Sequence, residues 1–142
     1  MRYNLLTASI AGLLLAGCGG TSDGPVPVPL DRVNCARCGM LLSSDANAAQ
    51  LRAPGEATRF FDDIGCLAGY TEARVEGTVR YVRLASGGWT STDSASFAVS
   101  RTARTPMDHG ILAFATSDEA RAADRDHQAR MWTAIVSHVE SR

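Results

Sequence analysis

The chain has 142 residues, and its 14 basic residues, all of them Arg, face 15 acidic ones for a net charge of −1. This balance, with no basic run longer than two residues, argues against nucleic acid as a partner. The composition, with 45% hydrophobic and 20% charged residues, is that of a globular protein. The length suits one domain, or two very small ones, around a modest core.

The N-terminus predicts an export signal followed by a lipid-attachment cysteine. Arg2 precedes the apolar run 5–16, which is shorter than the membrane span of about 20 residues and fits a signal-peptide core. Two small residues before Cys18 resemble a bacterial lipobox. We therefore expect residues 1–17 to be removed and Cys18 to carry the lipid of a periplasm-facing, membrane-anchored protein. Gly19, where an Asp would favour retention in the inner membrane, favours the outer membrane instead.

A spacer and a first compact unit follow. Residues 18–31, rich in Gly and Pro, predict a flexible and extended tether. A first unit is expected over residues 32–88, in the order β-β-α-β, with Asp62 or Asp63 capping its helix. Its predicted elements are strands at 48–53 and 58–62, a helix at 64–74 and a strand at 79–84.

A second unit with a looser version of the same pattern is expected over residues 89–142. Ser117 is a good N-cap for a helix over 118–124. The tail from 127 to 140 has apolar residues at the spacing of a terminal amphipathic helix. Strands are predicted at 95–100 and 111–115. The fold class is therefore α+β, with two small units and a C-terminal helix.

The sequence Cys35-Ala36-Arg37-Cys38-Gly39-Met40 opens the first unit with three sulfur donors in six residues. Thiolate and thioether ligands favour a soft monovalent metal, above all Cu(I). Gly39 permits the tight turn that would direct Cys38 and Met40 to one ion. Cys35 is a further candidate ligand, but it could equally act transiently during metal transfer or form a disulfide with Cys38.

The remaining cysteine, Cys66, leaves three thiols after lipidation, which is an odd number for an oxidising compartment. Its position beside apolar residues of the first helix predicts a core residue. Capping explains one of Asp62 and Asp63, and solvation explains the other, so neither suggests acid-base catalysis. We expect no catalytic residues in this chain.

Three other functions compete with copper binding. An exported thiol–disulfide oxidoreductase could use Cys35 and Cys38, although no β-α-β unit precedes the motif. A structural zinc knuckle lacks its second cysteine pair. An enzyme that cleaves organomercurials would need a cysteine pair and an acid at one point, which the sequence does not locate.

Three segments together resemble the NosL family, the accessory lipoproteins of nitrous-oxide reductase maturation. The resemblance covers nearly all of the chain after the signal, and it departs from the family at Asp108-His109, where similar proteins often carry glycine. The segments are 34–40 (Asn-Cys-Ala-Arg-Cys-Gly-Met), 60–67 (Phe-Phe-Asp-Asp-Ile-Gly-Cys-Leu), and 105–107 (Thr-Pro-Met) with 112–114 (Leu-Ala-Phe).

This resemblance implies two small β-β-α-β units related to the fold of organomercurial lyase. It also implies Cu(I) delivery in the periplasm to nitrous-oxide reductase or to its membrane-bound maturation complex. Met107, which by itself fits a loop or core filler, then becomes a third soft ligand beside Cys38 and Met40. His109 is a further candidate, because imidazole also binds copper.

Overall fold

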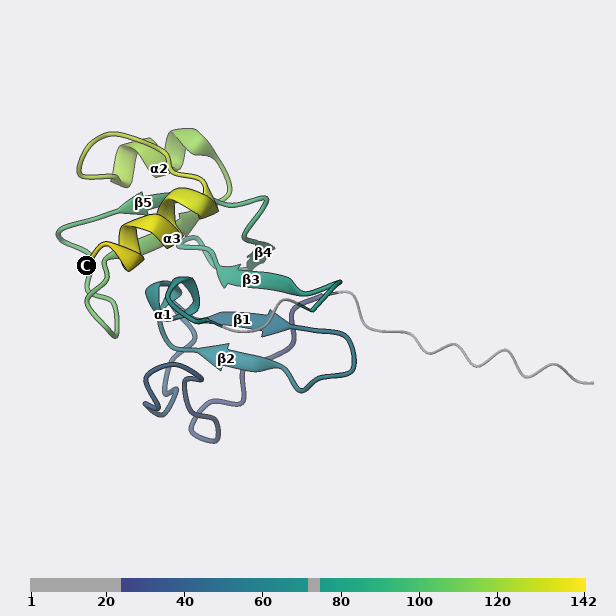
Figure 1. Cartoon of the computed structure of the whole chain (residues 1–142). Helices are drawn as coiled ribbons and strands as arrows, with labels where there is room; N and C mark the ends of the chain where they lie inside the picture. The colour runs from purple at the N-terminus through teal and green to yellow at the C-terminus, as the bar shows by residue number, and fades with distance from the viewer. Residues whose placement is uncertain (1–23, 72–74) are drawn as a thin grey trace, which may run out of the picture.

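The computed structural model describes residues 24–71 and 75–142 and shows a mixed α+β protein with a C-terminal helix, which confirms the α+β class of the prediction. Two antiparallel sheets are joined by three helices, the last of them at the C-terminus (Figure 1). No helix in these ranges is long and apolar enough to cross a membrane. The predicted signal sequence and Cys18 lie outside the described residues. The elements are β1 (Ala49–Arg52), β2 (Arg59–Phe61), α1 (Ile64–Ala68), β3 (Val79–Arg83), β4 (Trp89–Ser91), β5 (Ser96–Val99), β6 (Ile111–Phe114), α2 (Ser117–Ala123) and α3 (Trp132–Glu140).

The first sheet has the strand order β2-β1-β3-β4, so β2 lies at one edge. Its first three strands are those predicted, each slightly shorter than expected. The strand β4 was not predicted. Gly87 and Gly88, which were expected only to end β3, adopt φ angles of 91° and 80° and turn the chain back so that Arg83 pairs with Trp89. Glycine reaches such positive φ angles without a steric penalty.

The second sheet pairs β5 with β6 in the predicted positions, with Val99 opposite Ile111. On the other side of β5, Phe97 and Arg130 exchange backbone hydrogen bonds of 2.9 and 2.8 Å. The second half therefore has the order β-β-α, and Arg130 then pairs with β5 in the way that β3 pairs with β1 in the first half.

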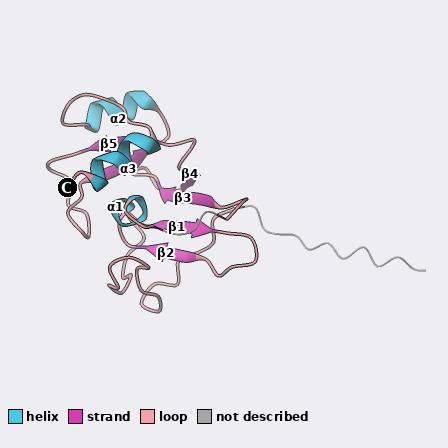
Figure 2. Cartoon of the chain, viewed as in Figure 1, coloured by secondary structure: helices cyan, strands magenta, loops and turns pink. Residues whose placement is uncertain are grey.

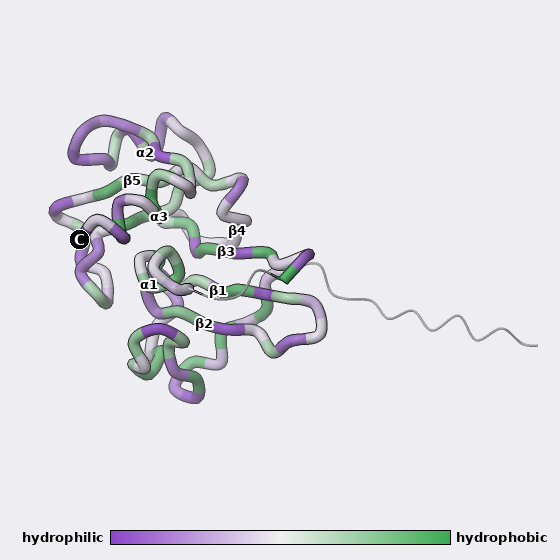
Figure 3. The backbone as a smooth tube through the Cα atoms, viewed as in Figure 1, coloured by the Kyte–Doolittle hydropathy of each residue, from purple (hydrophilic) through white to green (hydrophobic). Residues whose placement is uncertain are grey.

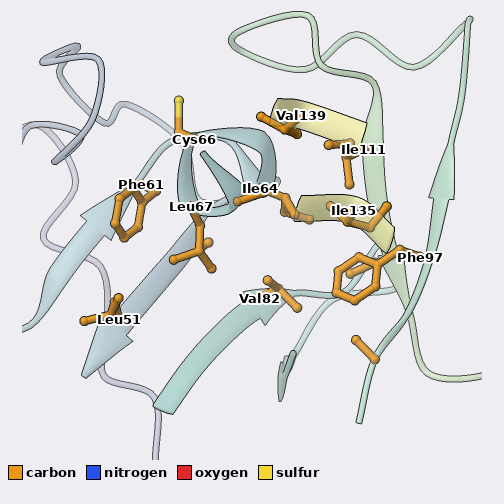
Figure 4. Close-up of a cluster of buried hydrophobic side chains, with 14 of the residues drawn as sticks. Leu51, Phe61, Ile64, Cys66, Leu67, Val82, Phe97, Ile111, Ile135 and Val139 are labelled. Atoms are coloured by element: carbon orange, nitrogen blue, oxygen red, sulfur yellow. The ribbon is translucent and has the colours of Figure 1, made fainter. Parts of the chain in front are cut away.

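The core lies between the two sheets, where α1 and α3 pack against each other. Figure 4 shows Ile64 of α1 beside Ile135 of α3, with Val82 and Phe97 entering from the two sheets. All four side chains are fully buried. Figure 3 shows that the segments around α2 are largely hydrophilic, so the helix adds little to this core.

The helix boundaries correct three predictions, one of which is the start of α3, at Trp132 instead of position 127. α1 ends at Ala68 instead of continuing to position 74, because Gly69 takes the C-cap position, and residues 72–74 lie outside the described ranges. Glycine is a poor helix former, which favours an early end. The N-cap of α2 is Thr116 and not Ser117: the Thr116 side chain accepts from the Glu119 amide, and the Glu119 carboxylate accepts from the Thr116 amide. This reciprocal capping box fixes the helix start one residue earlier than predicted.

The described end of the expected tether is held against the first sheet. The buried side chain of Gln50 accepts from the Val26 amide and donates to the Val26 carbonyl, both at 2.9 Å. Val26 and Val28 pack on the core. Residues 24–31 thus differ from the flexible spacer that their composition predicts, because one amide side chain pairs with their backbone as a neighbouring strand would.

Candidate metal centre

A short hairpin at residues 31–42, here called the thiol hairpin, carries Cys35 and Cys38. Its ends are tied by a hydrogen bond of 2.8 Å from the Asp31 amide to the Leu42 carbonyl, and its tip by one of 2.8 Å from the Cys35 amide to the Met40 carbonyl. Gly39 has a φ angle of 78° at the turn. The tight turn expected from this glycine is confirmed, and Figure 2 draws the hairpin as loop.

The thiol hairpin is held on the free edge of β2 by a hydrogen bond of 2.9 Å from the Ala36 amide to the Phe60 carbonyl. This contact places the hairpin beside the corner where β2 ends and α1 begins (Figure 1). Asp62 lies in that corner and Cys66 lies one turn into α1. Figure 4 shows the Cys66 side chain leaving α1 on the side away from Leu67.

Four side chains from these segments converge. The donor atoms of Cys35, Cys38, Asp62 and Cys66 all lie within 4.8 Å of one another. Two ligands that bind a common ion at about 2.3 Å each stand at most about 4.6 Å apart, so the group is near the spacing that one metal ion requires. We call these four residues the thiol cluster. It could hold a metal ion.

Burial divides the thiol cluster into an inner and an outer part. Cys35 is 3% exposed and Cys66 is 1% exposed, whereas Cys38 is only partly buried. All three are free thiols, so the pairing of Cys35 with Cys38 in a disulfide is not the arrangement of this structure.

Electrostatics keep two of these thiols protonated. Burial raises the pKa of Cys38, and the neighbouring Cys35 thiol and Asp62 carboxylate raise it further, although a hydrogen bond with the Met40 backbone opposes the shift. Burial likewise raises the pKa of Cys66, and Cys35 and Asp62 add to the effect. A nucleophilic cysteine of an oxidoreductase needs a lowered pKa, and the surroundings of Cys38 raise its pKa instead. A cation that displaces the protons would relieve the same repulsion.

Asp62 differs from the prediction for it. Solvation was expected to explain one of the two aspartates, but Asp62 is 5% exposed and both of its carboxylate oxygens lie 3.6 Å from the Cys38 sulfur. Asp63 is the helix cap, as predicted: one oxygen accepts from the Gly65 amide at 2.7 Å. The two adjacent carboxylates thus have separate roles, one in the thiol cluster and one at the start of α1.

Met107 and Met40 are both exposed residues, at 39% and 49%. The second oxygen of Asp63 accepts from the Met107 amide at 3.0 Å, which ties the 105–110 loop to the start of α1. Met40 is anchored through its carbonyl to Cys35. The Met40 backbone is therefore bonded to a cluster residue, whereas the Met107 backbone is bonded to Asp63, which follows Asp62 in the chain.

His109 packs on α1 and is not a member of the four-residue group. Its ring fills the space beside Gly65, where an added Cβ would lie 2.2 Å from the His109 Cγ atom. Its Nδ1 atom is buried without a hydrogen-bond partner. Burial lowers the pKa of this imidazole, although Asp63 opposes the shift. A neutral ring wedged against the helix is what this environment favours.

Sequence reasoning therefore missed Asp62 as a site residue and treated Cys66 only as core. Cys66 is indeed buried, as predicted, yet its sulfur also belongs to the thiol cluster. The sequence signal that could have revealed this pair is the spacing of Asp62 and Cys66 across a strand-to-helix corner, because positions four apart at a helix start can face the same side.

Comparisons with protein-family models, with curated proteins and with solved structures each found no match to this chain.

Proposed function

We propose that this protein binds Cu(I) in the thiol cluster and delivers it to a copper-accepting partner. The observation that carries the proposal is the convergence of three free thiols and one carboxylate within 4.8 Å, between the thiol hairpin and the corner where β2 leads into α1. Soft thiolates bind Cu(I) well, and two or three of them suffice. Copper is cargo here, and the chain needs no catalytic residue to carry it.

The identity of the metal depends on Asp62. Three thiolates and a carboxylate would also complete a tetrahedral zinc site, since zinc accepts sulfur and oxygen ligands together. Copper(I) would instead use sulfur alone, with Asp62 as a hydrogen-bond acceptor for a thiol. The Cys38–Asp62 contacts of 3.6 Å fit the second arrangement as well as the first. We favour Cu(I) because Met40, a further soft donor, lies on the same hairpin as Cys35 and Cys38, and because the family resemblance adds Met107.

The setting of this function is a bacterial periplasm. Cys18 within its lipobox supports attachment to a membrane, with the outer membrane favoured, and the NosL-like segments support a role in maturation of the copper site of nitrous-oxide reductase. The acceptor would be that enzyme or its membrane-bound maturation complex. Loss of lipid from a Cys18→Ser protein, with its release from the membrane fraction, would test the anchor separately from the metal.

The metal is tested by anaerobic titration of the folded protein with Cu(I) against the chromogenic chelator bicinchoninate, and by parallel titrations with Zn(II) and Cu(II). We expect one tight Cu(I) ion per chain and much weaker binding of the other two ions. Cys38→Ser should lower Cu(I) affinity by more than about 100-fold, since even residues outside the ligand shell change metal affinity by about 10- to 100-fold.

Two outcomes would contradict the proposal. Zinc binding of equal strength, abolished by Asp62→Asn, would make the cluster a zinc site. Unchanged Cu(I) affinity in Cys38→Ser would move the copper elsewhere. A Met40→Ala variant tests the thioether on the hairpin, and Met131→Ala is its matched control, because Met131 is 60% exposed and lies at the start of α3.

A second candidate function follows from the contact between Asp62 and Cys38. A cysteine pair with an adjacent carboxylate could cleave a carbon–mercury bond. Two thiols would bind the mercury and release two protons; Asp62 would pass one to the departing carbon, the other would go to solvent, and Hg(II) would stay on sulfur. Incubation with phenylmercuric acetate and measurement of benzene by gas chromatography tests this second function. The Asp62→Asn variant, in which Asp63 is unchanged, should release no benzene.

A further inference from the structure

The two ends of the first sheet have different neighbours. At one end, β2 leads into α1 and the thiol cluster. At the other end, β1 ends at Arg52, β2 begins at Arg59 and β3 begins at Val79. We call the residues of this second end, 52–59 and 75–80, the sheet tip. Figure 1 shows the turn between β1 and β2 at the end of the sheet opposite to α1.

The chain that comes from the predicted lipid anchor meets the domain at the sheet tip. The Arg52 side chain donates a hydrogen bond to the Gly24 carbonyl. Gln50, two residues further along β1 from the tip, pairs with the backbone of Val26. The chain then continues to Asp31 at the base of the thiol hairpin. The segment that enters the domain therefore runs along the sheet from the tip toward the thiol cluster.

We propose that the sheet tip lies on the surface of the bilayer that anchors the protein, and that the thiol cluster points away from the membrane. This inference rests on the part of the proposed function that places a lipid on Cys18, and it does not depend on which metal binds. Six residue steps separate Cys18 from Gly24, and a fully extended chain covers at most about 3.6 Å per residue, or about 22 Å here. A domain of about 100 residues has a radius of gyration of about 13 Å and a diameter of about 34 Å. A lipid on Cys18 thus keeps the sheet tip close to the bilayer.

Apolar side chains of the sheet tip suit the boundary between lipid headgroups and acyl chains. Val75 and Val79 are each 38% exposed. Pro54 lies on the exposed turn between β1 and β2. Exposed apolar groups of this kind are buried when a protein surface enters the headgroup region.

The charges of the sheet tip also suit lipid phosphate groups. Guanidinium groups bind phosphate, and their aliphatic stems cover apolar surface. One of the arginines forms an ion pair of 2.8 Å with Glu56. In the ranges 52–59 and 75–80, the arginines outnumber the carboxylates: they are Arg52, Arg59 and Arg80 against Glu56 and Glu76.

Such a small surface would bind a bilayer only weakly if the domain were free. The lipid anchor changes this, because a short tether makes the contact intramolecular and gives the sheet tip a high effective concentration at the membrane. A weak contact is then enough to orient the domain.

This orientation places the thiol cluster on the side that faces water. Asp62 follows the last residue of β2, at the end away from the tip. A strand of four residues such as β1 covers about 13 Å. Cys38, the partly exposed thiol of the cluster, is therefore open to a partner that approaches from the aqueous side.

Fluorescence quenching by lipids tests the orientation. Full-length lipidated protein is purified from membranes and reconstituted into vesicles of equal amounts of dioleoylphosphatidylcholine and dioleoylphosphatidylglycerol, with and without phosphatidylcholine brominated near the headgroup end of its acyl chains. Val75→Trp and Val79→Trp place a reporter at the sheet tip. Leu41→Trp is the matched control, because Leu41 is 52% exposed and lies on the thiol hairpin. Wild-type protein gives the background of the native Trp89 and Trp132.

We expect brominated lipid to remove about a third or more of the added fluorescence at the two tip positions, and less than about a tenth at Leu41→Trp, since only groups that enter the headgroup boundary approach the bromine atoms. Adding Val79→Glu to the Val75→Trp protein should reduce its quenching to the level of the control, because a carboxylate opposes entry into that boundary. Adding Leu41→Glu to the same protein should leave its quenching unchanged.

Several results would overturn the inference. Absence of quenching at the tip, or equal quenching at the tip and at Leu41→Trp, would show that the tip is not the face on the bilayer. Quenching that survives Val79→Glu would show that the tether alone brings the tip close and that its side chains have no affinity for lipid. Protein that does not float with the vesicles in a sucrose gradient would refute the lipid anchor, and the orientation with it. The Cu(I) titration tests the metal site independently of all these results.

Discussion

Asp62 in the first half of the molecule and Asp124 in the second are both buried beside a helix, and these two carboxylates have very different surroundings. Asp124, 2% exposed, accepts hydrogen bonds from the Val99 amide at 2.9 Å, the Asp126 amide at 2.7 Å and the Arg130 side chain at 3.1 Å. Asp62, 5% exposed, has its described side-chain contacts only with the thiol of Cys38, at 3.6 Å.

The difference shows how a structural carboxylate is distinguished from a functional one. Asp124 and Arg130 join the end of α2 to β5, and Arg130 then supplies the bridge to Phe97 that replaces a third strand. Buried polar groups in stable proteins are usually satisfied in this way. A buried carboxylate among protonated thiols gains no comparable stabilisation from the protein itself. The surroundings of Asp62 thus fit the metal-binding role proposed for the cluster better than a structural role.

The largest effect should come from removing the structural carboxylate. Asp124→Ala leaves the Arg130 guanidinium and two amides without their acceptor, and breaking a buried ion pair typically destabilises by 3–5 kcal/mol. The Arg130 side chain is 18% exposed, so we expect the lower end, about 3 kcal/mol. Urea unfolding measures this. The control is Asp118→Ala, whose carboxylate is 89% exposed beside Arg121, and which should change stability by less than about 0.5 kcal/mol. Equal effects of the two substitutions would remove the basis of the comparison.

The sequence could predict this fold further than it could predict the site. Local composition located the strands at 48–53 and 111–115, and the spacing of apolar residues located the C-terminal helix, in which Ile135 and Val139 are buried. The sequence could not predict the role of Arg130, since its partner Phe97 is 33 positions away in the chain and no local pattern indicates the pairing. Asp62 and Cys66 were missed as ligands for a related reason: only the docking of the thiol hairpin on β2 brings them to Cys38.

The two halves should also lose stability at opposite ends of the pH scale. Burial by itself raises the pKa of Asp124, but the hydrogen bonds from Val99 and Arg130 outweigh it and lower the pKa. A lowered folded-state pKa stabilises the protein above the unfolded value of about 3.9, and this stability is lost as pH falls through the folded value. Burial raises the thiol pKa values of Cys38 and Cys66. The stability that these two thiols contribute is fully present below about pH 8.5, the pKa of a cysteine in the unfolded chain. It is lost as the pH rises through the pKa values of the folded state.

Thermal unfolding of the metal-free protein from pH 2 to pH 10 checks both ends. Asp124→Asn should remove most of the acid loss, and Cys66→Ala should reduce the alkaline loss while lowering stability at pH 7 by about 1 kcal/mol. If Cys66→Ala instead altered only the acid limb, the assignment of the alkaline limb to the thiol cluster would be wrong.

The smallest effect on stability should come from Asp62→Asn, and it is the sharpest test of the comparison. An amide oxygen can still accept from the Cys38 thiol, and the substitution removes a buried charge that no described cation neutralises. We therefore expect the metal-free variant to be within about 0.5 kcal/mol of wild type, or more stable, because residues kept for function are often unfavourable for folding.

The metal-bound protein separates the remaining possibilities. If copper is held by sulfur alone, the rise in melting temperature on adding Cu(I) should persist in the variant, since a ligand that binds only the native state stabilises it in proportion to its affinity. If a divalent ion uses the Asp62 oxygen, stabilisation by Zn(II) should be lost while that by Cu(I) remains. A metal-free Asp62→Asn protein destabilised as strongly as Asp124→Ala would show that both carboxylates are structural, and the thiol cluster would then lose its strongest mark of function.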